Sequence, residues 1–187
     1  FGLGGADTRM KVGDYVRLGF ETMNGKLSSD EVMGRLEALG DGYDIKELVR
    51  REGYWENCYE GWREELRYLF FRYEECLSRN AGERINDVQW SKIWGDDPAR
   101  SIEHIVPQSA EPDFKHHLGN LCMLPPGLNS SLGDKPAREK ANAYTESGLR
   151  ETRRLGAKIV KTGGWTRQQA KIRAKVIERF VIRQWSQ

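Results

Sequence analysis

Apolar and polar positions recur along the chain with two different periods. The longer pattern lies between residues 55 and 79, where apolar and aromatic residues return every three or four positions with charged residues between them: Trp62, Leu66, Leu69, Phe70, Tyr73 and Leu77. This spacing predicts an amphipathic helix. An aromatic stripe of this kind belongs to a core far more often than to a platform on which bases stack.

Further helices are predicted on both sides of this one. Ser28 followed by Glu31 is typical of a capping box at a helix start, and Gly40 favours the end of that helix. Residues 44–51 predict another short helix, with three apolar residues toward the core: Ile45, Leu48 and Val49. Residues 83–100 show no clear period, so we expect an irregular segment there, with Trp90 and Trp94 packing on the core.

The shorter pattern lies in the middle of the chain. Two short apolar runs, Ile102–Val106 and Leu121–Leu124, predict strands, and a turn rich in Gly, Asn and Asp follows them. Pro136 favours the first turn of a helix that runs to about Tyr144. Thr166 is the expected N-cap of a last helix, whose apolar stripe is predicted as Ile172, Val176, Phe180, Ile177 and Val181.

These elements predict a mainly α fold with a small β-hairpin. We divide the chain into a linker or irregular segment over 1–27, a helical scaffold over 28–100, a core over 101–147 and a basic helical segment over 148–187 that packs on the core. The chain opens with Phe1 rather than Met, so we expect a fragment of a longer protein.

Composition narrows the class of protein. Hydrophobic residues make up 38% of the chain, and six Trp, seven Tyr and six Phe are enough to anchor a core. No apolar run approaches 18 residues and no secretory signal is visible, so we expect no membrane contact. Three Cys without a CxxC pair argue against a zinc ribbon or a disulfide framework, and a reducing cytoplasm is the expected location.

The net charge of +2 hides an asymmetry between the two ends. Residues 150–187 hold eleven Lys and Arg against two acids, a local charge of +9, so the remainder carries −7. This end is either a phosphate-facing surface or a solvated helix face, and charge alone does not decide between them. The candidates for phosphate contact in it are Arg167, Lys171 and Lys175.

Residues with catalytic potential gather around the two predicted strands. A carboxylate at Glu103 suits a hard cation such as Mg²⁺, and a neutral imidazole at His104 suits a general base. Neighbours on a strand point to opposite faces, so the two should do different work unless the strand ends there, as Pro107 favours. Together with the turn and helix that follow, they predict a ββα nuclease site that holds one divalent metal.

Other polar residues in this stretch complete the candidate site. Asn129 offers a carbonyl oxygen to Mg²⁺, and the amide of Asn120 can pin the loop that holds His104. His117 and Lys140 are candidates for phosphate contact. Each signal has a plain structural alternative: a lone strand His is usually structural, Glu next to His is common by chance, and Asn with Gly usually marks only a turn. The ordered combination is more specific than its parts.

This combination resembles the HNH (His-Me finger) endonucleases, among them the HNH domain of RNA-guided CRISPR nucleases. The stretch from Glu103 to Ser109 is similar to their first motif, with Glu103 where the family usually has Asp. The resemblance is closer to the C-terminal nuclease domain of GmrSD-type modification-dependent restriction enzymes. It rests on His117-x-Gly119-Asn120-Leu121, Leu124-Pro125, Asn129-Ser130, Gly133-x-Lys135, Lys140 and Tyr144-x-x-Ser147. It is strong over 101–147, moderate over 62–100 and 165–185, and absent before residue 62.

The resemblance implies a role for each matching residue. His104 is then the general base that activates water, Glu103 and Asn129 are the metal ligands, and Asn120 positions the His104 loop. Oxygen ligands favour Mg²⁺ or Mn²⁺ over Zn²⁺, and Glu103 carries one methylene more than the Asp that is usual at this position of the family. Lys135 joins the expected phosphate contacts. The implied partners are double-stranded DNA and a sensing or nucleotide-hydrolysing domain that precedes the nuclease half.

Three functions therefore compete. The first is a metal-dependent DNA endonuclease in phage defence, which nicks one strand at a time with little sequence preference. The second is a nucleic-acid-binding module with a degenerate nuclease core, and the third is a helical interaction domain with an accidental motif match. RNA stays open as a substrate, and glucosylated hydroxymethylcytosine and phosphorothioate DNA are equally open as targets.

Overall fold

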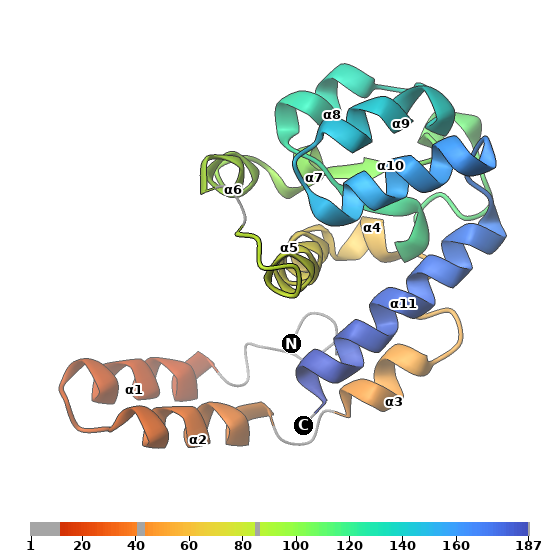
Figure 1. Ribbon diagram of the computed structural model, residues 1–187. Helices are drawn as coiled ribbons and strands as arrows, with labels where there is room; N and C mark the ends of the chain where they lie inside the picture. The colour runs from red at the N-terminus through yellow and green to blue at the C-terminus, as the bar shows by residue number, and fades with distance from the viewer. Residues whose placement is uncertain (1–11, 41–43, 85–86, 187) are drawn as a thin grey trace. The chain divides into compact units, whose positions relative to one another are not determined.

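The computed structural model describes residues 12–40, 44–84 and 87–186 (Figure 1). Residues 1–11 of the segment predicted as linker or irregular lie outside these ranges. Contacts between Cα atoms divide the chain into two compact units, Phe1–Leu48 and Val49–Gln187. The domain boundaries expected after residues 27, 100 and 147 lie at other positions than this division, and they stay predictions.

The first unit is built from helices. Helix α1 (Val12–Met23) packs against α2 (Ser29–Gly40). The irregular segment predicted over 1–27 is therefore wrong for 12–23; Gly13 and Gly19 lower the helix propensity there and obscure an otherwise helical pattern. The capping box before α2 is confirmed, because Ser28 N–H donates to the Glu31 carboxylate (2.8 Å) and Glu31 N–H donates to Ser28 Oγ (3.3 Å). Helix α3 (Ile45–Arg50) crosses the division between the units, and its buried Val49 belongs to the second unit.

The long helix predicted over 55–79 forms as two helices, α4 (Cys58–Gly61) and α5 (Arg63–Arg79), because the backbone of Trp62 leaves the helical region. The core residues predicted in α5 are confirmed for Leu66, Leu69 and Phe70, all buried. The turn before α4 is tied to the middle of the chain by two backbone hydrogen bonds. Cys58 N–H donates to His116 O (3.0 Å), and Leu118 N–H donates to Trp55 O (2.9 Å).

The irregular segment predicted over 83–100 is also wrong in part. Helix α6 (Asp87–Trp94) and the short helix α7 (Pro98–Ser101) lie within it, and Asp97 caps α7 by accepting the Ala99 N–H (2.7 Å). Trp90 and Trp94 both contact the ring of Phe71, which is itself only partly buried, and Trp94 stays 38% exposed. The pattern missed α6 because a helix this short shows barely two turns of periodicity.

The small hairpin is confirmed. Strand β1 (Ile102–His104) pairs antiparallel with β2 (Leu121–Met123), and Glu103 lies opposite Cys122. Two short 3₁₀ turns, η2 (Gln108–Ala110) and η3 (Leu118–Asn120), lie in the connection between the strands. Helices α8 (Pro126–Leu132) and α9 (Ala137–Glu146) follow, so the order ββα is present. Its assignment as a ββα-metal core stays a prediction.

Two C-terminal helices enclose this core. Helix α10 (Arg150–Thr162) packs on α9, and its Thr152 Oγ1 donates to Met123 O in β2 (2.8 Å). The buried Glu74 of α5 caps α10 by accepting the N–H groups of Arg150 and Glu151. The shared apolar core combines residues from the hairpin, α8, α9 and α10: Ile105, Cys122, Leu124, Leu132, Ala141, Tyr144, Leu155 and Ile159.

Helix α11 (Arg167–Trp185) begins at the predicted cap, where Thr166 and Gln169 form a capping box. Its apolar stripe is shifted from the prediction: Ile177, Phe180 and Val181 are buried, whereas Ile172 and Val176 are 51% and 44% exposed. The buried face is completed by Ala170, Ala174 and Arg173. A buried arginine and two alanines carry little hydrophobic signal, which is why the pattern placed the stripe on a neighbouring face.

Gly119 allows α11 to approach η3 at backbone distance. A Cβ atom added to Gly119 would overlap the backbone of Ala170 in α11. Beside this contact, Arg173 donates to the carbonyl oxygens of Leu118 (3.2 Å) and Leu121 (2.6 Å) and pairs with Glu151 (2.7 Å). The distance between α11 and the strands is therefore set by backbone atoms.

We predict that Gly119→Ala lowers the free energy of unfolding by about 1–3 kcal/mol or more, because backbone atoms of α11 must move to admit the methyl group. The matched control is Gly127→Ala in α8, where a Cβ meets nothing within 4 Å, so stability should be unchanged or raised. Urea denaturation measures both. Equal stability of the two variants would contradict the close approach.

Candidate active site

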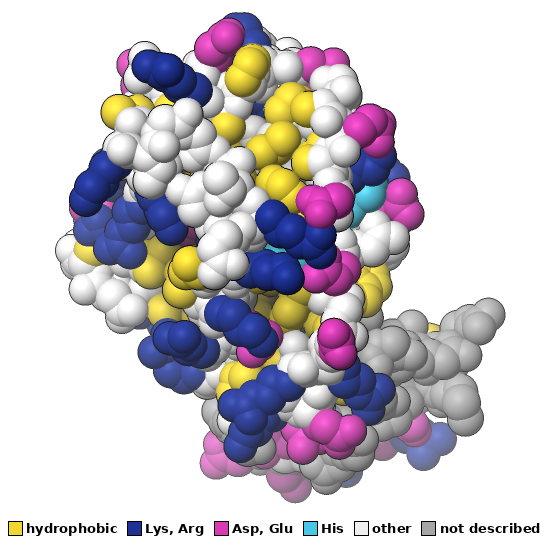
Figure 2. All heavy atoms as spheres, turned by 90° about the vertical axis from the view of Figure 1, so that its right-hand side faces the viewer, with side chains coloured by type: hydrophobic (Ala, Val, Ile, Leu, Met, Phe, Trp, Pro, Cys, Tyr) yellow, Lys and Arg dark blue, Asp and Glu magenta, His cyan; other side chains and the backbone are white. Residues whose placement is uncertain are grey.

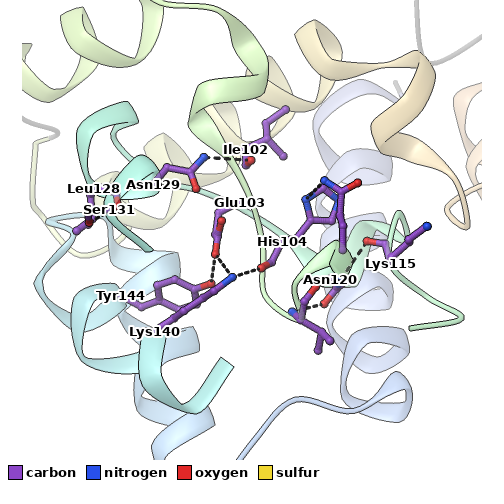
Figure 3. A network of polar contacts seen from close by, with 12 residues as sticks. Ile102, Glu103, His104, Lys115, Asn120, Leu128, Asn129, Ser131, Lys140 and Tyr144 are labelled. Carbon is purple, nitrogen blue, oxygen red and sulfur yellow. Dashed lines mark hydrogen bonds and ion pairs between the residues drawn. The ribbon is translucent and has the colours of Figure 1, made fainter. Parts of the chain in front are cut away.

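Glu103 and His104 are neighbours on β1, and both are 6% exposed. Their side chains leave the strand in opposite directions, as the alternation predicted: Figure 3 shows the Glu103 carboxylate meeting α9, while the His104 imidazole points away from it. Strand β1 ends at His104, as Pro107 favoured. The two residues thus have separate surroundings.

The Glu103 carboxylate is held by two side chains of α9. Lys140 Nζ lies 2.6 Å from Glu103 Oε1, and the Tyr144 hydroxyl donates to the same oxygen at 3.1 Å. Lys140 also donates to the carbonyl oxygen of His104 (2.9 Å). Burial raises the pKa of the Glu103 carboxyl, while Lys140 and Tyr144 act against that rise.

Lys140 does not lie where a phosphate contact would require. Its residue is 1% exposed, and its ammonium is committed to Glu103 and to the backbone of His104. The physical reason is charge pairing, because a buried carboxylate needs a nearby cation. Lys140 is that cation, whereas we had expected it to contact phosphate.

The His104 imidazole lies in a polar and aromatic setting. Its Nε2 is 3.3 Å from His116 Nδ1, Gln108 Nε2 approaches its Nδ1 at 3.4 Å, and the Tyr59 ring meets it edge-on at 4.5 Å between centroids. Burial lowers the pKa of His104 to about 3, and His116, Lys140 and Lys115 add to the effect. The imidazole is therefore neutral near pH 7, the state in which it can accept a proton.

Asn120 is fully buried and holds the backbone that follows His104. Its Oδ1 accepts the Val106 N–H (2.9 Å), and its Nδ2 donates to Val106 O (3.1 Å) and to Lys115 O (3.0 Å). The amide thus joins both ends of the connection between the strands. These bonds agree with the expected positioning of the His104 loop.

Asn129 and Glu103 offer the oxygen donors expected for a metal. Asn129 Nδ2 donates to Arg100 O (2.9 Å) and Ile102 O (3.3 Å). The other amide atom, Oδ1, is the one that can coordinate a metal. A carboxylate and an amide oxygen suit a hard divalent cation that keeps several waters. Among the described residues, no group of three or more His, Cys, Asp or Glu side chains lies close enough together to hold a metal. A cation here would have to share Glu103 with Lys140.

The other predicted phosphate contacts differ in their exposure. His117 is 5% exposed, and its Nδ1 accepts the Gly119 N–H (3.0 Å), so it acts as a cap for η3. Lys135 and Lys171 are exposed, Lys175 pairs with Glu178 (2.9 Å), and Arg167 pairs with Asp113 and with Glu56 (3.6 Å). Figure 2 shows Lys and Arg side chains spread over one face, with Asp and Glu among them.

Sequence reasoning missed the group beside His104. Tyr59 and Glu60 come from α4, more than forty residues away from His104 in the chain. In the structure the Tyr59 ring stacks on His116 with an interplanar angle of 6°, and His116 Nε2 lies 3.4 Å from Glu60 Oε1. No local spacing links these residues, so only the fold reveals the group.

Comparison with known proteins places the chain. The family model described as "GmrSD restriction endonucleases, C-terminal domain" matches residues 44–179. The chain belongs to this family. No curated protein and no solved structure matches it.

The GmrSD match corrects the expected extent of the resemblance. We expected none before residue 62, yet the match begins at residue 44 and includes α4. Among residues 12–40, 44–84 and 87–186, no helix has the length and apolar character needed to cross a bilayer.

We predict that Lys140→Met lowers the free energy of unfolding by about 3–5 kcal/mol, because it leaves Glu103 buried without a cation. The double variant Glu103→Gln/Lys140→Met should recover much of this loss, and the exposed Lys135→Met serves as the control. Denaturant titration of wild type, Glu103→Gln, Lys140→Met and the double variant gives the coupling energy. Additive effects of the two single substitutions would contradict the pair.

We predict that His104 makes the protein less stable in acid. Its pKa is about 3 when folded and near 6.5 when unfolded, so this contribution is intact above pH 6.5 and is lost as the pH falls toward 3. At pH 5 the loss amounts to about 2 kcal/mol. Unfolding curves of wild type and His104→Asn from pH 7 to 5 test this, and parallel stability profiles would contradict it.

Proposed function

We propose that this chain is a metal-dependent DNA endonuclease domain that nicks one strand at a time in restriction of foreign DNA. The observation that carries the proposal is His104, a neutral imidazole at the end of β1 whose following loop is held by Asn120. The chain's place among the GmrSD restriction endonucleases supports DNA as the substrate.

The proposed chemistry assigns separate work to the two sides of β1. His104 accepts a proton from the attacking water as the general base. Glu103 and Asn129 supply the oxygen atoms that would hold Mg²⁺ or Mn²⁺. Such a cation, when bound, stabilises the negative charge that develops on the phosphate. Asn120 keeps the His104 loop in place. Lys140 balances the Glu103 charge on the face of β1 opposite to the His104 imidazole.

DNA is expected to meet the exposed basic residues of the C-terminal helices. Exposed Lys and Arg on α10 and α11 include Arg153, Arg154, Lys158, Lys161, Lys171, Lys175 and Arg179. Contacts of this kind act on the phosphate backbone without reading sequence. Selectivity for modified DNA is then the task of a sensing domain that works with this one.

We predict that the purified chain converts supercoiled plasmid to open circles with Mg²⁺ or Mn²⁺ and not with EDTA. His104→Ala should lower the rate about 10²–10⁴-fold, the usual scale for loss of a general base. Gel retardation should show that this variant still binds DNA, because the substitution leaves the basic helices unchanged.

The alternative function is nucleic-acid binding by an inactive nuclease core, which the +9 charge of residues 150–187 favours. It predicts salt-sensitive retardation of plasmid without metal-dependent nicking. Cleavage by His104→Ala at the wild-type rate would remove His104 from the mechanism. Retardation without cleavage by wild type would favour the alternative.

A further inference from the structure

A chain of three polar groups leads from the surface to His104. The Glu60 carboxylate is exposed, and its Oε1 lies 3.4 Å from Nε2 of His116. The other nitrogen of His116, Nδ1, lies 3.3 Å from Nε2 of His104. His116 therefore stands between a carboxylate and the imidazole that the proposed function uses as a base.

The chemistry of the outer carboxylate fixes the direction of this chain. A carboxylate only accepts hydrogen bonds, so the contact at 3.4 Å favours a proton on Nε2 of His116, the nitrogen that faces Glu60. In a neutral imidazole the other nitrogen then accepts, and Nε2 of His104 must carry the proton that it receives. The lone pair of His104 is left on Nδ1, where the amide Nε2 of Gln108 approaches as a donor at 3.4 Å.

Nδ1 of His104 faces a side chain that can move. Gln108 is an exposed residue, and its contact with His104 is long for a hydrogen bond. A water molecule can take the place of this amide without disturbing buried groups. The nitrogen that holds the lone pair is therefore also the nitrogen that lies beside the exposed Gln108.

Several contacts hold His116 in its orientation. The Tyr59 ring lies nearly parallel to the His116 ring, with centroids 5.6 Å apart. The backbone of His116 accepts the Cys58 N–H (3.0 Å), and Asn57 Nδ2 donates to Glu60 Oε2 (3.0 Å). The imidazole and its carboxylate partner are thus placed by the same short segment of chain.

We propose that His116 is a positioning residue that, with Glu60, keeps the proton on Nε2 of His104 and the lone pair on Nδ1. The base is then in the tautomer needed to take a proton from water at its solvent-facing nitrogen. Without His116, both neutral tautomers of His104 become available and the ring loses one anchor. This role rests on the proposed nuclease function, in which His104 is the base.

Two substitutions separate this role from simple packing. Asn at position 116 keeps an oxygen near the place of Nδ1 that can accept from His104, whereas Leu offers similar bulk with no acceptor. We predict that His116→Leu lowers kcat for plasmid cleavage about 10-fold or more. Removal of a hydrogen-bonding partner from a metal-ligating His has an effect of this scale. KM for plasmid should stay within about 2-fold, and His116→Asn should recover most of the rate. Equal rates for the Leu and Asn variants would overturn the proposal.

A spectroscopic measurement tests the tautomer without relying on cleavage. The imidazole ¹⁵N signals of His104 in the wild-type protein should show a protonated Nε2 and an unprotonated Nδ1, and His116→Leu should shift them toward a mixture. A wild-type protein with the proton on Nδ1 would overturn the proposal, whatever its activity. A wild-type protein with the expected tautomer but no metal-dependent nicking would count against the nuclease function alone.

Discussion

A strand of three residues, buried on both faces, places a carboxylate and an imidazole side by side in sequence and back to back in space. Ile102, Glu103 and His104 are all nearly inaccessible, so each polar side chain must find its partners within the protein. Helix α9 provides them on the Glu103 side, and α4 with the loop before η3 provides them on the His104 side. Much of the surrounding architecture meets this requirement.

Lys140 interacts electrostatically with the polar groups on both faces of β1. Its ammonium pairs with Glu103 and also donates to the carbonyl oxygen of His104, and its positive charge helps to lower the pKa of that imidazole. One buried cation therefore stabilises an anion on one face of the strand and disfavours a second cation on the other. The His104 imidazole is therefore uncharged in the neutral pH range, with a lone pair on one of its ring nitrogens.

The sequence predicted those parts of the fold whose signals are local. The hairpin, α5, the capping box at Ser28, the N-cap at Thr166, and the positions of Glu103 and His104 on opposite faces all follow from short-range patterns. Helix α6 was too short to show a period, and the Arg173 face of α11 hides its burial behind a charge. Their burial depends on tertiary contacts, which no window of neighbouring residues contains.

The same limit separates the parts of the candidate site. Asn120 could be predicted to hold the loop because its bonds to Val106 stay within one motif. Burial of Lys140 could not, since helical spacing shows where a lysine lies along α9 but not which neighbour faces it. Tyr59 and Glu60 were beyond reach for a simpler reason: they join His116 only through the fold.

Two backbone hydrogen bonds join Trp55 and Cys58 to the segment from His116 to Leu118. Because of them, the candidate site includes more of the chain than its central motif. They join segments that are distant in the chain, so the motif from Glu103 to Tyr144 does not contain all the residues around His104. Grafting that motif alone onto another scaffold would leave His116 without its ring partner and its carboxylate. The smallest transplantable unit must also carry the turn and helix α4.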